Sequence, residues 1–173
     1  AVRGAIDLEE LGPIATTVDC DVLNADGGTR CASITAANIA LRLAIRRLIT
    51  NGKCLPADLR LSPEQIRNGK KPPRLSAEQA AEHELAVLRW DLAAISVGLI
   101  DGEVYTDLDY ILDSNADVDM NVVMISNGKY VEVQGTGEEF TYTRDELDAL
   151  LDAATVGIEK LNEIQASILD GVE

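Results

Sequence analysis

Strand-like and helix-like stretches fall in separate blocks along this chain, and this arrangement restricts its fold class more than any other feature. Four short runs have the pattern of strands: residues 92–100, 104–110, 121–125 and 130–134. The dipeptides Asp101-Gly102 and Asn127-Gly128 between them are hairpin signals. Because the strands are grouped instead of alternating regularly with helices, we expect an α+β fold with mixed sheets packed against helices.

A long amphipathic helix is expected after the last strand. Thr143, with Glu146 three residues later, has the pattern of a capping box at a helix start. One apolar stripe then continues at helical spacing: Leu147, Leu150, Leu151, Ala154, Ile158, Leu161 and Ile164. This stripe predicts that one face of the helix is buried.

The first third of the chain has the pattern of a strand, a glycine turn and a helix. Residues 14–23 alternate like a strand, with Cys20 on the apolar face, where it is most simply a small buried hydrophobe. A glycine turn follows at residues 26–28. From Thr29, apolar residues recur at helical spacing until the Asn-Gly stop signal at residues 51–52.

The connection that follows differs in composition. Residues 53–75 contain four prolines and the pair Lys70-Lys71, which predicts a loop or broken helix on the surface. Ser76 with Gln79 is a second capping-box pattern, so a short helix is expected over residues 77–88.

Composition excludes several classes of function. The 173 residues are 46% hydrophobic, enough for a core, and their net charge of −15 is the wrong sign for general adhesion to nucleic acid. Aromatic residues are too few for a base-stacking surface. No apolar run has the length of a membrane span and no signal peptide is evident, so we expect a soluble, cytoplasmic protein without a membrane partner.

Histidine and cysteine chemistry is not favoured. The only histidine, His83, lies between Glu82 and Glu84 and is expected to be a solvated surface residue. The three cysteines lack the spacing of a zinc or redox motif, which suits free thiols in a reducing compartment. Cys31, in the first turn of its helix, could have a lowered thiol pKa from that position.

The glycine turn before Thr29 is a candidate anion site. A helix start offers unpaired backbone N–H groups and partial positive charge, and Gly28 allows the backbone to approach an anion closely. Thr29 adds a hydroxyl donor, and Arg30 adds a planar guanidinium that matches phosphate oxygens. The alternative, an ordinary glycine turn with a solvated arginine, is favoured about two to one on this motif alone.

A cluster of aspartates is the second candidate site. Its members fall within thirteen residues: Asp107, Asp109, Asp113, Asp117 and Asp119. Oxygen ligands without nearby histidine or cysteine suit a hard cation such as Mg²⁺, and Mn²⁺ would satisfy the same oxygens. A solvated acidic loop is an equally good interpretation, and a Mg²⁺- or Ca²⁺-binding module unrelated to RNA is a weaker one.

Together, the two sites favour phosphoryl transfer. One would hold a free anion and the other a divalent cation, and together they could support attack on a phosphodiester. With no histidine base at hand, a nucleophile that needs no deprotonation is attractive, and inorganic phosphate is one. The residues therefore favour phosphorolysis over hydrolysis.

Three runs closely resemble the ribonuclease PH family of bacterial phosphorolytic exoribonucleases: VDCDVLNADGGTRCASITAANIAL, AAISVGLIDGEVYTDLDYILDSNADVDMNVVM and YVEVQGTGEEFTYTRDELDALL. The resemblance implies an RNase PH-type fold, ribosomal protein S5 domain 2-like, and a homo-oligomeric, hexameric ring. It implies phosphate-dependent 3′ to 5′ trimming of tRNA precursors, related rRNA processing, and release of nucleoside diphosphates. The reverse nucleotidyl transfer is expected too, because the bonds exchanged are similar.

The resemblance also assigns residues. It implies that Gly28, Thr29 and Arg30 bind the attacking phosphate, and that Asp113 and Asp119 bind Mg²⁺ and support catalysis. It divides the chain into the end of a first subdomain at residues 1–56, an extended connection at 57–89 and a second subdomain at 90–173.

Differences from the family support a second hypothesis, that the chain is not catalytic. Leu112 stands where the family usually has Glu, and Cys31 where Thr is usual. Relative to the family, the chain is expected to lack about the first third, which includes a phosphate-contacting arginine. A complementary N-terminal fragment could supply it; the alternative is a noncatalytic ring subunit or a truncated remnant.

Overall fold

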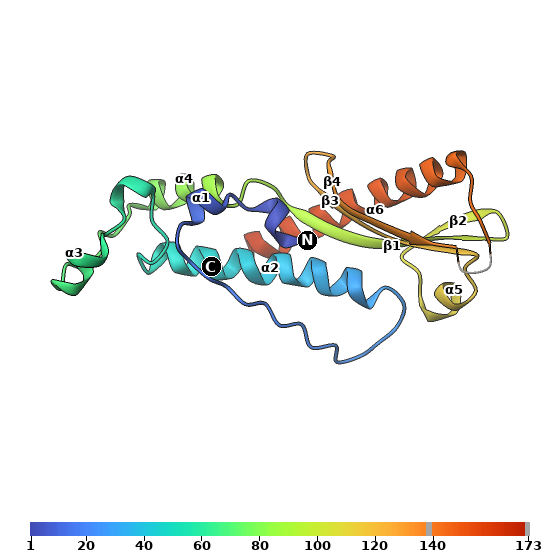
Figure 1. Ribbon diagram of the computed structural model, residues 1–173, viewed down its shortest axis with the longest axis horizontal. Helices are drawn as coiled ribbons and strands as arrows, with labels where there is room; N and C mark the ends of the chain where they lie inside the picture. Colours follow the sequence, from blue (N-terminus) through green and yellow to red (C-terminus); the bar gives the residue numbers. More distant parts are fainter. Residues whose placement is uncertain (138–139, 172–173) are drawn as a thin grey trace.

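The computed structural model describes residues 1–137 and 140–171. A four-stranded sheet lies between two long helices, and most of the shorter helices lie at one end of the molecule (Figure 1). In chain order the elements are η1 (Val2–Ala5), α1 (Leu8–Leu11), α2 (Thr29–Thr50), η2 (Ala57–Leu59), α3 (Pro63–Arg67), α4 (Ala77–Val87), β1 (Leu92–Ile100), β2 (Glu103–Thr106), α5 (Tyr110–Ser114), β3 (Val118–Ile125), β4 (Tyr130–Thr136) and α6 (Arg144–Asp170). The α+β class is confirmed.

The sheet has the strand order β2-β1-β3-β4, and every described pair is antiparallel where a mixed sheet was expected. Both hairpin signals are confirmed: Asp101 and Gly102 have φ values of 51° and 81°, and Gly128 has a φ of 83°. Strand β2 ends at Thr106, earlier than expected, because Asp107 has a φ of 59°, outside the β region, and the chain then turns into α5.

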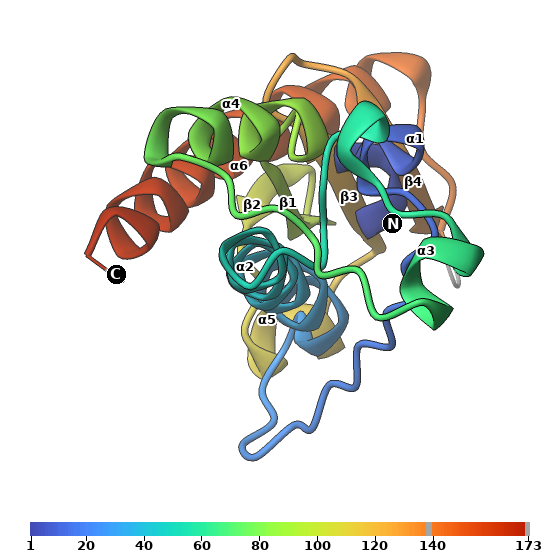
Figure 2. The same ribbon diagram turned by 90° about the vertical axis from the view of Figure 1, so that its left-hand side faces the viewer.

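The two faces of the sheet carry different helices. On one face, Val118, Met120 and Val122 of β3 pack with Leu150 and Ile158 of α6 in the main buried cluster. On the other face, the buried cluster includes Cys31 of α2, together with residues of β1 and β3. Figure 2 shows α2 and α6 on opposite sides of the strands. Successive residues of β3 therefore point alternately toward α6 and toward α2.

Helices α2 and α6 begin as the sequence predicts. Thr143 and Glu146 form the predicted capping box, with the Glu146 N–H 3.2 Å from the Thr143 hydroxyl. The predicted apolar stripe of α6 is buried around Leu150 and Ile158, but Ile164 is 54% exposed, and its neighbour Gln165 faces the interior instead. None of the helices in the described ranges has both the length and the apolar character that crossing a bilayer requires.

Two buried amides connect α2 with α6. The Asn38 side chain donates to Oε1 of Gln165 (2.9 Å), and Gln165 Nε2 donates to the carbonyl of Leu92 at the start of β1 (3.1 Å). Both side chains are almost fully buried. Each thus satisfies polar atoms that would otherwise be costly to bury.

The prediction of a strand over residues 14–23 is wrong. The segment is extended but forms no ladder in the described structure, and it runs outside the sheet beside α2 (Figure 1). Cys20 is exposed, not buried, and its thiol lies 3.6 Å from the Ser33 carbonyl. An alternating sequence needs a neighbouring strand to become part of a sheet, and none lies beside it here.

Residues 53–75 form a connection with only two short helices, η2 and α3, as the prolines predict. The connection is anchored at its beginning by buried Cys54 and Leu55. Helix α4 follows with the predicted capping box of Ser76 and Gln79. The interpretation of residues 53–75 as a surface segment is therefore correct except at its first residues.

The prediction that His83 is a solvated surface residue is wrong. Its side chain is 3% exposed, and its Nε2 lies 3.6 Å from the thiol sulfur of buried Cys54. Burial lowers the pKa of His83 from 6.5, an effect opposed by the nearby Glu10 carboxylate and reinforced by Arg60. Burial likewise raises the pKa of Cys54. Both groups are therefore neutral at pH 7 and act as part of the core.

We expect the fold to lose stability as the pH falls below 6.5. The folded-state pKa of His83 is depressed, so its contribution is complete above the unfolded pKa and is lost as the unfolded state takes up the proton. The slope is at most about 1.4 kcal/mol per pH unit. Urea unfolding of the wild type and of His83→Gln between pH 5.5 and 7.5 measures it, and equal slopes for the two proteins would contradict the prediction.

Candidate functional site

The glycine turn at the start of α2 is packed tightly against the loop between β2 and α5. A Cβ on Gly27 would lie 2.1 Å from the Leu108 carbonyl oxygen, and one on Gly28 would lie 2.9 Å from the Ser96 hydroxyl. Gly28 has a φ of 68°, the left-handed conformation that glycine adopts without strain. The close approach therefore requires glycine at both positions.

Ser96 and Asp26 hold this turn against its neighbours. The buried Ser96 hydroxyl accepts from the Leu108 N–H (3.1 Å). The Asp26 carboxylate accepts from the N–H groups of Gly27 (3.0 Å) and Tyr110 (2.6 Å). The turn at the start of α2 and the start of α5 are thus joined by side chains of residues distant in sequence.

Helix α2 begins at this turn without a side-chain cap. Gly28 is its N-cap residue and supplies no side-chain acceptor for the first-turn N–H groups. These groups belong to Thr29, Arg30 and Cys31, and with the helix dipole they create positive potential at the end of a 22-residue helix. An anion is the natural ligand of such an arrangement.

Arg30 is directed to the neighbouring edge strand. In the structure its guanidinium donates to Oε1 of Gln134 and forms an ion pair with Glu132, both on β4. About half of the Arg30 side chain remains exposed (48%). The guanidinium is therefore positioned by β4 and still accessible to a ligand from solvent.

A row of polar residues crosses the sheet beneath the start of α2. Ser96 of β1, Asn121 of β3 and Gln134 of β4 are direct neighbours in the strand register. Direct partners in an antiparallel pair share a face, and the contacts of Cys31 with Asn121 and of Arg30 with Gln134 identify it as the α2 face.

Asp119 belongs to the next row of the same face. It is a direct register partner of Gly98 on β1 and Thr136 on β4. Because Asp119 and Asn121 are two residues apart on one strand, their side chains point to the same side. The structure thus brings one of the predicted aspartates to the sheet face on which Arg30 and its turn are seated.

The pKa of the Cys31 thiol depends on its burial and on the charged groups near the start of α2. Burial raises its pKa to about 11; Arg30 opposes the rise, and the carboxylates of Asp107, Asp119 and Glu132 reinforce it. The prediction of a lowered pKa from the helix start is therefore wrong, because desolvation by burial outweighs the favourable charge of Arg30. The thiol instead donates to Oδ1 of Asn121 (2.9 Å).

Asp113, the other predicted aspartate, lies on α5, half buried. Within the described residues its carboxylate forms no ion pair with Arg30. The structure therefore places Asp119, but not Asp113, on the sheet face beneath the arginine.

The five aspartates do not form one ligand group. Asp109 caps α5 by accepting from the Leu112 N–H (2.8 Å), and Asp117 accepts from the Asp101 N–H (2.9 Å). No group of three or more histidine, cysteine, aspartate or glutamate side chains in residues 1–137 and 140–171 is arranged to enclose a metal. The donor chemistry still fits Mg²⁺, which is commonly held by one or two carboxylates with water and substrate oxygens.

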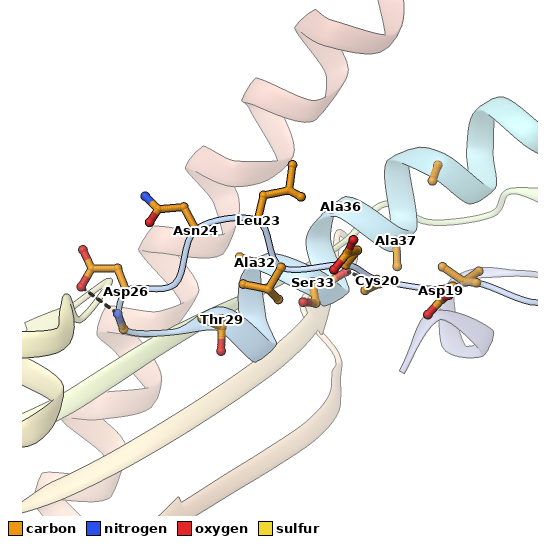
Figure 3. A pocket seen from close by; sticks show the side chains of 15 residues that line it. Asp19, Cys20, Leu23, Asn24, Asp26, Thr29, Ala32, Ser33, Ala36 and Ala37 are labelled. Atoms are coloured by element: carbon orange, nitrogen blue, oxygen red, sulfur yellow. Dashed lines mark hydrogen bonds between the residues drawn. The ribbon is translucent and has the colours of Figure 1, made fainter.

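A cavity of about 640 Å³ adjoins the glycine turn (Figure 3). Its walls come from the extended segment 18–24 and from small residues of α2, including Ala32, Ser33 and Ala36. Gly27 and Thr29 also line it. The cavity therefore opens directly beside the residues predicted to bind an anion.

Sequence reasoning missed Ser96, Asn121, Glu132 and Gln134. Each is a polar residue on a strand, and all four contact α2 residues or the turn. Ser96 and Asn121 lie within buried apolar runs, whereas Glu132 and Gln134 are on the more exposed strand β4. A polar side chain at an inward position of a strand is a usable signal, because burying it requires a partner.

Comparison with known proteins gives consistent results. Residues 92–157 match the family model "3' exoribonuclease family, domain 2". The chain is 41% identical over 169 residues to ribonuclease PH of Crocosphaera subtropica and 45% identical to that of Rhodopirellula baltica. Each alignment covers 98% of this chain but only 58% and 59% of the relatives, respectively. The chain thus spans less than two thirds of the length of these curated relatives.

A solved structure shows the same fold at lower sequence identity. It is the Archaeoglobus fulgidus exosome with RNA bound to the active site, with a TM-score of 0.50 and 18% identity. The match covers 82% of this chain and 44% of that one. At this identity the likeness establishes the fold.

Proposed function

Because the chain belongs to the ribonuclease PH family, we propose that it carries the phosphate-binding half of a phosphorolytic 3′ to 5′ exoribonuclease. The observation that carries the proposal is the uncapped start of α2, with Arg30 beside it, seated on the sheet face that bears Asp119. An anion site and a carboxylate on one surface suit phosphoryl transfer.

In this reaction, inorganic phosphate attacks the last phosphodiester of an RNA. A new bond forms between a phosphate oxygen and the phosphorus of the terminal nucleotide, the bond to the 3′ oxygen of the preceding nucleotide breaks, and that oxygen takes up a proton. The products are a nucleoside diphosphate and an RNA shortened by one nucleotide. One phosphorus–oxygen bond replaces another, so the reaction is reversible.

The residues of the turn divide the work of holding the phosphate. Gly28 allows close approach, the Thr29 hydroxyl and the first-turn N–H groups donate to phosphate oxygens, and Arg30 supplies charge and a planar pair of donors. Held in this way, the phosphate can be kept in line with the scissile bond. Gln134 orients the guanidinium before substrate arrives, and phosphate competes with the Glu132 carboxylate for it.

Asp113 and Asp119 would hold the divalent cation, Mg²⁺ or Mn²⁺. When bound, the cation supplies positive charge that offsets the negative charge developing on the leaving oxygen. The register of β3 between β1 and β4 sets Asp119 on the same sheet face as Arg30, which supports this role.

The wider biology belongs to the same proposal. We assign the substrate class to RNA with a free 3′ end, such as tRNA precursors and rRNA, and the assembly to a homo-oligomeric ring, a hexamer, in the cytoplasm. We also propose that the chain consists of part of a first subdomain (residues 1–56), an extended connection (57–89) and a second subdomain (90–173). A complementary polypeptide would supply the length that the relatives have in addition.

A phosphate-dependence assay tests the proposal. The purified chain, with the intact mass of every component recorded, is incubated with an RNA bearing a 3′ overhang, with and without phosphate. We expect nucleoside diphosphates only when phosphate is present, and their loss in Asp119→Asn. Release of nucleoside monophosphates without phosphate would show hydrolysis and contradict the proposal.

A noncatalytic ring subunit is the second candidate function. Leu112, where the family usually has a carboxylate, and the engagement of Arg30 by Glu132 favour it. A folded chain that assembles but releases no diphosphate, alone or with a polypeptide supplying the remaining length, would support this candidate over the first.

A further inference from the structure

We propose that the connection between α2 and α4 carries a surface that binds the RNA backbone away from the 3′ end. This basic surface consists of Lys53, Arg67, Lys70, Lys71 and Arg74. The choice of RNA as its ligand rests on the proposed function, whereas the surface itself rests on charge, exposure and position.

Charge is distributed unequally along the chain. Residues 53–74 contain six of the fifteen lysines and arginines but only two of the thirty aspartates and glutamates, so their net charge is +4 while the rest of the chain carries −19. A polyanion is repelled by most of this molecule and attracted at this segment. The segment is therefore the place where an RNA backbone can be held with a net attractive charge nearby in sequence.

The cations of the basic surface are available to a ligand. All five residues are exposed, and none of them takes part in an ion pair within the part of the chain that the structure describes. Arg60 of the same segment behaves differently, because its guanidinium donates to the carbonyls of Leu55, Glu9 and Glu10. Arg60 thus anchors the segment, and the other cations remain free.

The structure also brings separate parts of the segment together. A cavity of about 340 Å³ is lined by both Lys53 and Lys70, with apolar walls that include Leu11 and Ile14. A capping box of Ser62 and Gln65 stabilises the start of helix α3. The cations are therefore carried by a folded segment with defined contacts.

Helix α2 separates the basic surface from the phosphate-binding turn. The turn precedes Thr29 and the basic surface begins after Thr50, and Figure 1 shows α3 at the end of the molecule far from α5. With a rise of about 1.5 Å per residue, 22 helical residues span roughly 33 Å. At about 3.4 Å per stacked nucleotide, this distance corresponds to roughly ten nucleotides.

The chemistry of the surface fits backbone contact without sequence preference. Residues 53–75 contain no aromatic residue on which a base could stack. Lysine acts toward phosphate as a point charge, and arginine can add paired donors. An RNA that reaches from the turn to this surface gains affinity from several phosphates at once.

The test compares two double variants of equal charge change. Lys70→Gln with Lys71→Gln removes two cations of the basic surface, and Arg3→Gln with Lys129→Gln removes two exposed cations outside it. Binding of a 20-nucleotide RNA to the full chain is measured by fluorescence anisotropy without phosphate, over a range of salt. We expect the first variant to lose affinity about tenfold at low salt and to reduce the salt slope by about 1.4, and the control to change little.

Length dependence separates this inference from the proposed function. A four-nucleotide RNA cannot reach the basic surface, so its binding and its phosphorolysis are expected to be equal in the two variants. Equal losses for the 20-nucleotide RNA would show a general charge effect and overturn the inference. A change in oligomeric state without a change in RNA affinity would assign the surface to a second, acidic copy of the chain and overturn it too.

Discussion

Replacement of Arg30 by alanine is expected to reduce phosphate-dependent diphosphate release by about a hundredfold or more. The side chain supplies the only guanidinium seen at the start of α2 in the described residues, and removal of one preorganised donor at a developing charge costs about 10²–10³ in rate. Steady-state kinetics at varied phosphate concentration is the measurement. The expected signature is a rise in the KM for phosphate together with a fall in kcat.

Glu132→Gln is the matched variant for this prediction. It keeps a polar side chain on β4 and leaves Gln134 in place, but it removes the carboxylate that competes with phosphate for the guanidinium. Half-exposed ion pairs contribute about 0.2–1 kcal/mol, so we expect the KM for phosphate to fall by up to about fivefold. If Arg30→Ala left the phosphate dependence unchanged, the assignment of the phosphate site to this turn would be wrong.

Gly27→Ala is expected to impair both stability and phosphate binding. The new methyl group would lie 2.1 Å from the Leu108 carbonyl oxygen and 2.6 Å from the Asp109 carbonyl carbon, so backbone has to move. Forcing extra volume into a packed site costs about 1–3 kcal/mol, and the turn would be displaced from the start of α5. Urea unfolding and calorimetric titration with phosphate measure the two effects.

Gly171→Ala provides the control, because a Cβ there meets its nearest neighbour at 3.6 Å, an ordinary contact, and its φ of −88° suits any residue. We expect the control to unfold like the wild type. A Gly27→Ala protein of wild-type stability and phosphate affinity would contradict the tight packing of the turn described above.

Local signals in the sequence predicted the helices well. The capping patterns of Thr143 with Glu146 and Ser76 with Gln79 involve residues three apart, and the structure forms both. The start of α2 at Thr29 follows from the glycine turn in the same way. These features depend on neighbours along the chain, which is why sequence reasoning reaches them.

The errors arose where the outcome depends on distant residues. Residues 14–23 alternate like a strand, but no strand in the described part of the chain pairs with them. His83 has charged neighbours in sequence, yet packing of α4 against the rest of the molecule buries it. The pKa of Cys31 follows its burial against Asn121, ninety residues away.

The candidate site was predictable in part for the same reason. The sequence motifs identified Arg30 and Asp119 as candidate site residues, because each lies in a short distinctive motif. It did not identify Glu132 and Gln134 as partners of Arg30, because they are 102 and 104 residues away in sequence. The role of each predicted site residue in binding phosphate or a cation stays a prediction.

The buried amides of Asn38 and Gln165 make the relative position of the two long helices nearly unique. An apolar contact between α2 and α6 could be shifted along the helix axis with little loss, because one methyl group replaces another. A shift of one helical turn here would take Gln165 away from the buried Asn38 amide and from the Leu92 carbonyl. Polar bonds of Asn38, in the first half of α2, thereby help to align the start of the helix, where the glycine turn meets the sheet.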